Sequence, residues 1–221
     1  MFEHDTRAWK DEIYSQFARI GKALASPKRL EILELLSQGP KTVETLAHET
    51  EASVANVSQH LQVLLQARMV RFEKQGTYAV YQLSSGTTTK LLLLFEDLGE
   101  EILTEINHLR EELTKDTDFP EPLSVEELET RLKSGDITLI DVRPKEEYDV
   151  AHIPGAISIP ITELETKLST LPRNKEIVSY CRGPYCVYAT QATDLLTSKG
   201  YKAIRLQEGV REWNELYSTY H

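Results

Sequence analysis

The spacing of apolar residues along the first third of the chain changes from a helical period to a strand period. Apolar residues recur every three or four positions in the early segments, and Gly39-Pro40 ends one of them with a typical helix stop. Two β-rich runs follow and flank Gln75-Gly76, where glycine supplies the positive φ of a hairpin turn. The expected elements are helices at about 6–25, 27–38, 43–50 and 54–67, and strands at 69–74 and 77–83.

A longer amphipathic helix is predicted from about Thr88 to Leu113. Its apolar residues form one stripe on an otherwise acidic helix, at Leu91, Phe95, Leu98, Ile102, Ile106, Leu109 and Leu113. A continuous stripe of this kind favours packing against a partner, and packing within its own chain is the alternative.

The second half of the chain alternates helical and strand patterns, which predicts an α/β domain with a parallel sheet. Helices are expected at about 125–133, 145–150, 162–168, 186–199 and 209–217, and strands at 137–142, 156–159, 176–180 and 203–206. The polar segment before Pro120 and Pro122 discourages a continuous helix. We therefore predict a first domain at 1–115, a linker at 116–122 and a second domain at 123–221.

Composition and charge narrow the functional classes. The 221 residues are 40% hydrophobic and 27% charged, with a formal net charge of −10, which is typical of a soluble globular protein and disfavours indiscriminate binding of polyanions. Residues 19–90 are nevertheless net positive, with nine basic and six acidic side chains. Without a membrane span or an apolar leader, the chain is expected to be cytoplasmic, with no membrane partner.

The segment from Ser53 to Val70 resembles the recognition helix of ArsR-family winged-helix repressors. The matching core is Ser58, His60, Leu61 and Leu64, and the likeness extends over about residues 10–110. It implies a mainly helical α+β winged helix-turn-helix domain whose recognition helix, with Ser53 as N-cap, enters the major groove. The expected buried face of that helix is Val57, Leu61, Leu64 and Leu65.

The resemblance implies double-stranded operator DNA as a partner. Side chains that suit base edges lie on the recognition helix, and basic side chains that suit phosphates lie nearby. The candidate DNA-binding residues are Lys41, Ser53, Asn56, Ser58, Gln59, His60, Arg71 and Lys74. Asn56 and Gln59 can pair bidentately with adenine, whereas Lys41, Arg71 and Lys74 suit phosphates, and a solvated polar face is the alternative for each.

The ArsR resemblance also bears on assembly and metal sensing. In that family the helix matching 88–113 packs against its two-fold mate, which implies a homodimer on a roughly palindromic operator. Many members sense metals through cysteines or His and carboxylate pairs, but this chain offers only His108 among acidic residues there. No metal site and no cofactor is therefore expected.

The second half resembles a rhodanese domain over nearly all of residues 120–217. The motifs are Leu139–Pro144 with Glu146–Tyr148, His152–Ala156, the segment Tyr180–Val187 at the position of the active-site loop, and Leu206–Trp213. The resemblance implies structural roles for Asp141, Arg143 and His152. The sequence departs from many rhodaneses at Cys186, because they carry a basic residue at this position.

The loop Cys181–Cys186 carries the candidate chemistry. A thiolate at the end of a strand, backed by a helix N-terminus, has a depressed pKa and can attack a sulfane sulfur to become a persulfide. Cys181 is the expected nucleophile, and Arg182 supplies positive charge. The segment formed by Gly183, Pro184, Tyr185 and Cys186 is expected to cradle the persulfide with its backbone N–H groups. Cys186 is either a resolving thiol, giving a disulfide or a trisulfide, or a small buried apolar residue.

Phosphatase-type chemistry is disfavoured by the same loop. Tyrosine phosphatases and arsenate reductases use His-Cys-x5-Arg, whereas Tyr180 and Val187 stand at the His and Arg positions here.

Three functional hypotheses follow. The first is a DNA-binding regulator, a repressor, that responds to thiosulfate, polysulfide or a low-molecular-weight persulfide through Cys181. The second is a rhodanese-type sulfurtransferase whose winged helix only tethers it to DNA or autoregulates its operon, so enzymatic turnover is left open. The third is a metalloid-responsive repressor using both cysteines.

Overall fold

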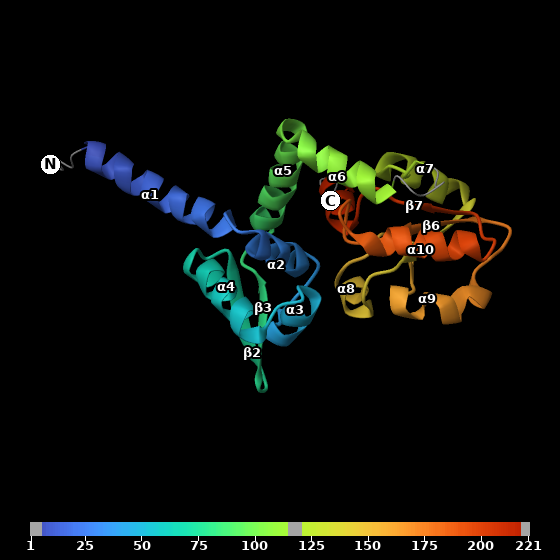
Figure 1. The fold of residues 1–221 in the computed structure, drawn as a ribbon, viewed down its shortest axis with the longest axis horizontal. Helices are drawn as coiled ribbons and strands as arrows, with labels where there is room; N and C mark the ends of the chain where they lie inside the picture. Colours follow the sequence, from blue (N-terminus) through green and yellow to red (C-terminus); the bar gives the residue numbers. More distant parts are fainter. Residues whose placement is uncertain (1–5, 115–120, 218–221) are drawn as a thin grey trace. The chain divides into compact units, whose positions relative to one another are not determined.

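The computed structural model describes residues 6–114 and 121–217, and the chain forms two compact units, Met1–Leu92 and Leu93–His221 (Figure 1). Residues 115–120 lie outside the described part, so the predicted linker at 116–122 and the domain ends at 115 and 123 stay predictions. No helix within the described residues combines the length and apolar character that a membrane crossing requires.

The first unit is a small helical domain with a three-stranded antiparallel sheet. Its elements are α1 Thr6–Leu24, α2 Pro27–Ser37, β1 Lys41–Thr42, α3 Val43–Glu49, α4 Val54–Gln66, β2 Val70–Gln75, β3 Tyr78–Leu83 and the start of α5 Gly86–Ile102. The sheet order is β1-β3-β2, and Gln75 pairs with Tyr78 across the turn. Gly76 has φ +63°, which explains why glycine stands in this turn.

The helix-turn-helix consists of α3 and α4, and both helices have side-chain caps. The Ser53 hydroxyl accepts a hydrogen bond from the Asn56 amide, which confirms Ser53 as the N-cap of α4. Val57, Leu61 and Leu64 are fully buried, as expected, whereas Leu65 is only partly buried and packs at the edge of the same core.

Helix α1 buries little of its apolar surface within the described chain. Only Ala23 and Leu24 at its end are buried. The large apolar side chains that remain exposed recur at helical spacing, at Trp9, Ile13, Tyr14, Phe17 and Ile20.

The predicted helix from 88 to 113 is wrong in one respect, because it is two helices. Helix α5 ends at Ile102, and α6 runs from Thr104 to Thr114. A Cβ at Gly99 would lie 3.0 Å from the Ile106 Cδ1 atom, so glycine lets α6 pack closely on the end of α5. The apolar stripe is thereby interrupted, with Ile106 partly buried against Gly99 while Leu98 and Ile102 are exposed.

The second unit contains a four-stranded sheet, order β5-β4-β6-β7, whose strands are all parallel. Besides the end of α5 and α6, its elements are α7 Val125–Ser134, β4 Ile137–Asp141, α8 Lys145–Val150, β5 Ile157–Ser158, α9 Ile161–Lys167, a 3-10 turn Leu168–Thr170, β6 Glu176–Tyr180, α10 Val187–Ser198, β7 Ala203–Arg205 and α11 Val210–Tyr217. The α/β parallel-sheet prediction is confirmed.

Alternation along the strands divides the core into two layers. Val178 and Tyr180 pack with residues of α7 and α11 on one face, whereas Ile177 and Cys181 pack with residues of α9 and α10 on the other. Both faces of β4 and β6 are therefore covered, as is usual for the central strands of a parallel sheet.

The Ser53 cap generates a stability prediction. We expect Ser53→Ala to destabilise α4 by about 1 kcal/mol, because the Asn56 amide loses its acceptor. Hydrogen exchange of the α4 amides should accelerate accordingly. Ser37→Ala is the control, since that hydroxyl donates to the Glu34 carbonyl at the end of α2 and does not cap α4. Equal exchange rates in both variants would contradict the prediction.

Candidate functional site

The loop after β6 brings the two cysteines together. Cys181 follows the last residue of β6 and Cys186 occupies the N-cap position of α10, and they are joined by a disulfide with the Cα atoms 6.2 Å apart. The Cys186 amide donates to the Gly183 carbonyl at 3.2 Å, which closes the turn. Because these strands are parallel, the pair lies at their carboxyl ends, where open α/β sheets place their sites.

The backbone of Gly209 holds the start of this loop by close approach. A Cβ at Gly209 would lie 2.5 Å from the Arg182 carbonyl oxygen and 2.9 Å from that of Cys181. No side chain fits there without displacing the loop backbone. This contact explains why glycine stands just before α11, in the Leu206–Trp213 motif.

Arg182 is committed to a buried ion pair. Its guanidinium donates to both carboxylate oxygens of Glu147, with Nη2 2.6 Å from Oε1, and the side chains are 9% and 1% exposed. This geometry does not favour the expected role of Arg182 in meeting an incoming anion, because the Glu147 carboxylate of α8 already compensates its charge. Its role in the structure is to anchor the loop.

A second buried pair supports the neighbouring strand ends. Arg143 Nη2 lies 2.6 Å from Asp141 Oδ2 and 2.8 Å from the Ala151 carbonyl oxygen, which agrees with the structural role expected for this pair. The Tyr180 hydroxyl accepts a hydrogen bond from the Ile153 amide, and burial raises the pKa of Tyr180 far above its usual value. The site therefore has a neutral phenol where phosphatases carry histidine.

His152 lies beside α8 and contacts it in two ways. Its ring stacks on Tyr148 with centroids 3.9 Å apart, and Nδ1 is 3.0 Å from the Tyr148 carbonyl oxygen. These contacts at the end of α8 agree with the structural role expected for His152.

Two side chains near the loop contact acidic residues of α5. The Tyr185 hydroxyl donates to Glu100 Oε1 at 2.7 Å, and Arg211 binds both carboxylate oxygens of Glu96 at 3.1 and 3.0 Å. Burial, and then the bond to Glu100, raise the pKa of Tyr185, so it stays a protonated donor. The sequence assigned Tyr185 to the loop but contained no signal for these contacts.

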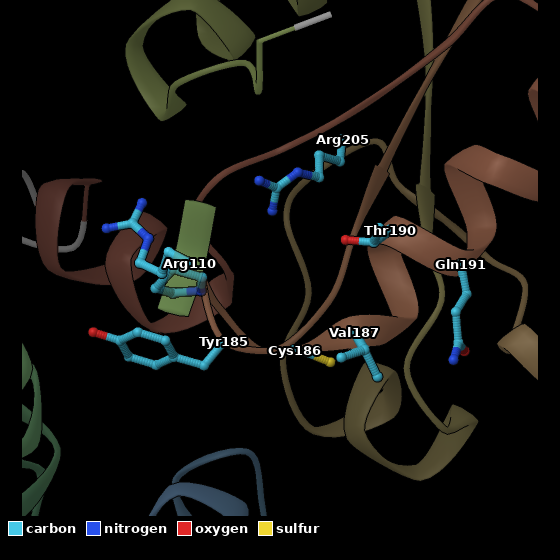
Figure 2. Close-up of a pocket in the computed structure, with 8 residues that line it drawn as sticks. Arg110, Tyr185, Cys186, Val187, Thr190, Gln191 and Arg205 are labelled. Carbon is cyan, nitrogen blue, oxygen red and sulfur yellow. The ribbon is translucent and has the colours of Figure 1, made fainter. Parts of the chain in front are cut away.

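A cavity of about 210 Å³ opens beside Cys186 (Figure 2). Arg205, at the end of β7, lines it together with Thr190 and Gln191 of α10 and Arg110 of α6. Sequence reasoning missed Arg205. Its signal was available, because alternation in β7 puts this charged residue on the same face as buried Ala203.

Some of the candidate DNA-binding residues are exposed, whereas others already have partners within the protein. Asn56 and Gln59 are exposed on α4, and Ser58 and His60 are partly exposed. The Ser53 hydroxyl is already used by the cap. Lys41 is buried on β1 and lies 3.6 Å from Glu49, so its assignment to DNA phosphates is not supported by its surroundings.

The basic residues of the wing are accessible. Arg71 and Lys74 lie on β2, and both are exposed. Lys28 and Arg29 at the start of α2, which sequence reasoning did not select, are close enough to α4 to act on His60. Partial burial, and then the charges of Arg29 and Lys28, lower the pKa of His60 below its usual value. His60 is therefore neutral near pH 7 and can both donate and accept.

Across residues 6–114 and 121–217, no group of three or more His, Cys, Asp or Glu side chains is arranged to hold a metal ion. Cys181 and Cys186 are bonded to each other in this structure.

Two family models match the chain, one in each half. Residues 26–71 match "Bacterial regulatory protein, arsR family", and residues 124–216 match "Rhodanese-like domain".

Curated relatives show the same division. The chain is 37% identical over 204 residues to the HTH-type transcriptional regulator Rv0324 of Mycobacterium tuberculosis, which covers 92% of this chain and 89% of that protein. It is 35% identical to the human thiosulfate:glutathione sulfurtransferase, over 42% of this chain and 92% of that one. It is 36% identical to the arsenical resistance operon repressor of Bacillus subtilis, over 38% and 80%.

The Arg182–Glu147 pair generates a second stability prediction. We expect Arg182→Met to lower the free energy of unfolding by about 3–5 kcal/mol, because it leaves a buried carboxylate without this counter-charge. The additional change Glu147→Gln should recover much of that loss. Chemical denaturation followed by circular dichroism measures both.

Lys145→Met is the matched control, because it removes an exposed ion pair with Asp149 and should change the stability far less than loss of the buried pair does. An Arg182→Met variant as stable as this control would show that Arg182 is no anchor.

Proposed function

Because the chain belongs to the ArsR family of bacterial transcriptional regulators and carries a rhodanese-like domain, we propose that its DNA binding responds to reactive sulfur species. The observation that carries the proposal is the pair Cys181 and Cys186, within bonding reach in one loop whose Tyr185 also binds α5. Persulfide formation at Cys181 is the proposed input, and operator affinity is the proposed output.

The loading step transfers one sulfane sulfur. In the reduced protein the Cys181 thiolate attacks the outer sulfur of thiosulfate, a new S–S bond forms, and the old S–S bond breaks with its electron pair leaving on sulfite. The products are a Cys181 persulfide anion and sulfite, with the charge unchanged. A polysulfide or a low-molecular-weight persulfide reacts in the same way, with a shorter polysulfide or a thiolate as leaving group.

The resolving step uses the second cysteine. The Cys186 thiol gives its proton to the persulfide anion, the resulting Cys186 thiolate attacks the Cys181 sulfur, the disulfide forms, and the terminal sulfur leaves as hydrosulfide. The sulfane sulfur is reduced to sulfide and the two cysteines are oxidised, so no outside oxidant is needed. The bond between Cys181 and Cys186 in this structure supports the idea that the loop can adopt the product geometry.

Helix α5 supplies a physical route from this loop toward the DNA-binding unit. Tyr185 and Arg211 bind Glu100 and Glu96 near its C-terminal end, whereas Leu92 is buried in the core that also holds α4. A change in the loop that breaks the Tyr185 bond alters the environment of a helix that is continuous with that core. Such coupling between sites is typically worth about 1–3 kcal/mol.

A homodimer is the proposed DNA-binding form. The exposed apolar residues of α1 and of α5, among them Phe17, Leu98 and Ile102, leave surfaces that a second copy would cover. The ArsR family resemblance implies the same two-fold assembly, which matches a roughly palindromic operator.

A sulfurtransferase is the second candidate function. Its support is the likeness of residues in the second unit to the human thiosulfate:glutathione sulfurtransferase, together with the cysteine at the head of the loop. In that case the Cys181 persulfide is passed on in repeated turnover, and operator affinity does not follow the sulfur state.

The DNA interface generates a prediction about specificity. Because Gln59 is exposed on the recognition helix, Gln59→Ala should lower the binding free energy by about 1–3 kcal/mol through one base position of the operator. Arg71→Ala should instead weaken binding to all DNA sequences alike and reduce the slope of log binding constant against log salt concentration by about 1. Fluorescence anisotropy with operator variants at several NaCl concentrations separates the two. Gln66→Ala, at the far end of α4, is the control. A salt slope unchanged by Arg71→Ala would contradict the phosphate contact.

The sulfur response generates the central prediction. Treating the reduced protein with a polysulfide should change operator affinity by about tenfold or more, and the change should disappear in Cys181→Ser. Mass spectrometry of the loop peptide identifies the persulfide, disulfide or trisulfide in each sample.

Cys186→Ser separates the two steps, because it permits the persulfide but not the disulfide. A persulfide at Cys181 with operator affinity unchanged in every variant would refute the sensor and favour the tethered sulfurtransferase.

A further inference from the structure

The cavity beside Cys186 contains a cation that its surroundings do not neutralise. Arg205 is partly buried at the end of β7, and among the described residues it has no carboxylate partner. A guanidinium withdrawn from water without a counter-ion is unfavourable. Burial, and then the nearby charge of Arg110, lower the pKa of Arg205, which is the effect expected where an anion is missing.

The strand register explains why this cation lies at the cysteine pair. Arg205 is paired in register with Ser179 of β6, two positions before Cys181. Residues two apart on a strand share a face, so Ser179, Cys181 and Arg205 all lie on the side covered by α10. The Ser179 hydroxyl bonds to the Ala189 carbonyl and to Thr193, which anchors α10 over this face.

Neutral hydrogen-bonding groups line the same cavity. Figure 2 shows the Arg205 guanidinium and the Thr190 hydroxyl turned toward one space, above Cys186. Gln191 also lines the cavity, whereas Arg110 is already paired with Glu100 at 2.6 Å. Arg205 therefore supplies the uncompensated charge, and Thr190 and Gln191 can supply further hydrogen bonds.

The size of the cavity selects the class of ligand. Its volume of about 210 Å³ greatly exceeds the roughly 10–15 Å³ that one water needs, and it is below the roughly 300–1,000 Å³ of pockets for larger ligands. Cys186 forms part of its wall and is bonded to Cys181. A small anion held here lies beside Cys186, whose sulfur is bonded to that of Cys181.

We infer that Arg205, with Thr190 and Gln191, forms a subsite for the anionic end of a small sulfur compound. The inference rests on the proposed sulfur chemistry and adds the substrate class: a donor with an oxyanion or carboxylate group, either thiosulfate or the persulfide of a carboxylate-bearing thiol. The buried pair of Arg182 with Glu147 leaves Arg205 as the charge that selects for anions.

Noncovalent binding tests the subsite without any sulfur transfer. In the full chain carrying Cys181→Ser and Cys186→Ser, thiosulfate should bind measurably by calorimetry, and Arg205→Gln should weaken that binding roughly tenfold or more, as expected for loss of a charged hydrogen-bond donor. Lys202→Gln removes an equal charge from an exposed site nearby and should have no effect. Equal affinity in the Arg205→Gln and Lys202→Gln proteins would overturn the subsite.

A second pair of donors tests the persulfide source and the role of charge. N-acetylcysteine persulfide and its methyl ester carry the same sulfane sulfur, but only the first has a carboxylate, so the reduced protein should load faster from the donor with the carboxylate, and Arg205→Gln should abolish that preference. If neither donor loads Cys181, the proposed function fails while thiosulfate binding still decides the subsite. If both load equally in the wild-type protein and thiosulfate does not bind, the subsite is wrong and the proposed function stands.

Folding of the variant is checked separately. Since Arg205 has no carboxylate partner in the described chain, Arg205→Gln should keep or raise the thermal midpoint. Arg205→Lys retains the charge without the planar fork and should preserve part of the binding. A gain of thiosulfate affinity in Arg205→Gln would also overturn the inference.

Discussion

The buried ion pair between Arg182 and Glu147 is the interaction on which the geometry of the cysteine loop depends. It ties the residue after Cys181 to α8, while the close approach of Gly209 holds the same backbone from the side of α11. With the loop start held at both points, the chain turns back within five residues, and Cys186 reaches Cys181. Each contact is buried, so water does not compete for it, and the loop holds the two sulfur atoms within bonding reach of each other.

The same pair determines where a substrate's charge can be met. An arginine next to a candidate nucleophilic cysteine suggests an anion-binding group, yet the Arg182 guanidinium is bonded to both oxygens of the Glu147 carboxylate, which compensates its charge. The positive charge available to a ligand comes instead from Arg205, on the neighbouring strand and the same face of the sheet. Arg182 therefore anchors the loop, whereas Arg205 supplies the charge available to an anion, so that two arginines share what one could have done.

Two acidic side chains of α5 bind residues in and near the cysteine loop. Glu96 and Glu100 lie on the acidic part of the amphipathic helix expected from the sequence, but Arg211 of α11 and Tyr185 of the cysteine loop bind their carboxylates. The break after Ile102 allows Arg110 of α6 to reach Glu100 as well. A single carboxylate thus receives a phenol and a guanidinium, and its bonding is sensitive to movement of either.

The sequence by itself determined the division into a winged helix-turn-helix and an α/β domain, the N-cap at Ser53, the hairpin at Gly76 and the position of Cys181 at a strand end. These features depend on local periodicity, capping and glycine conformation, which act over a few neighbouring residues. Tertiary structure alone decided the partner of Arg182, the burial of Lys41, the break at Leu103 and the placement of Arg205 beside Cys186. Those outcomes depend on which side chains from distant segments meet. The sequence pattern around a charged residue does not show whether its side chain will face water, a carboxylate or the wall of a cavity.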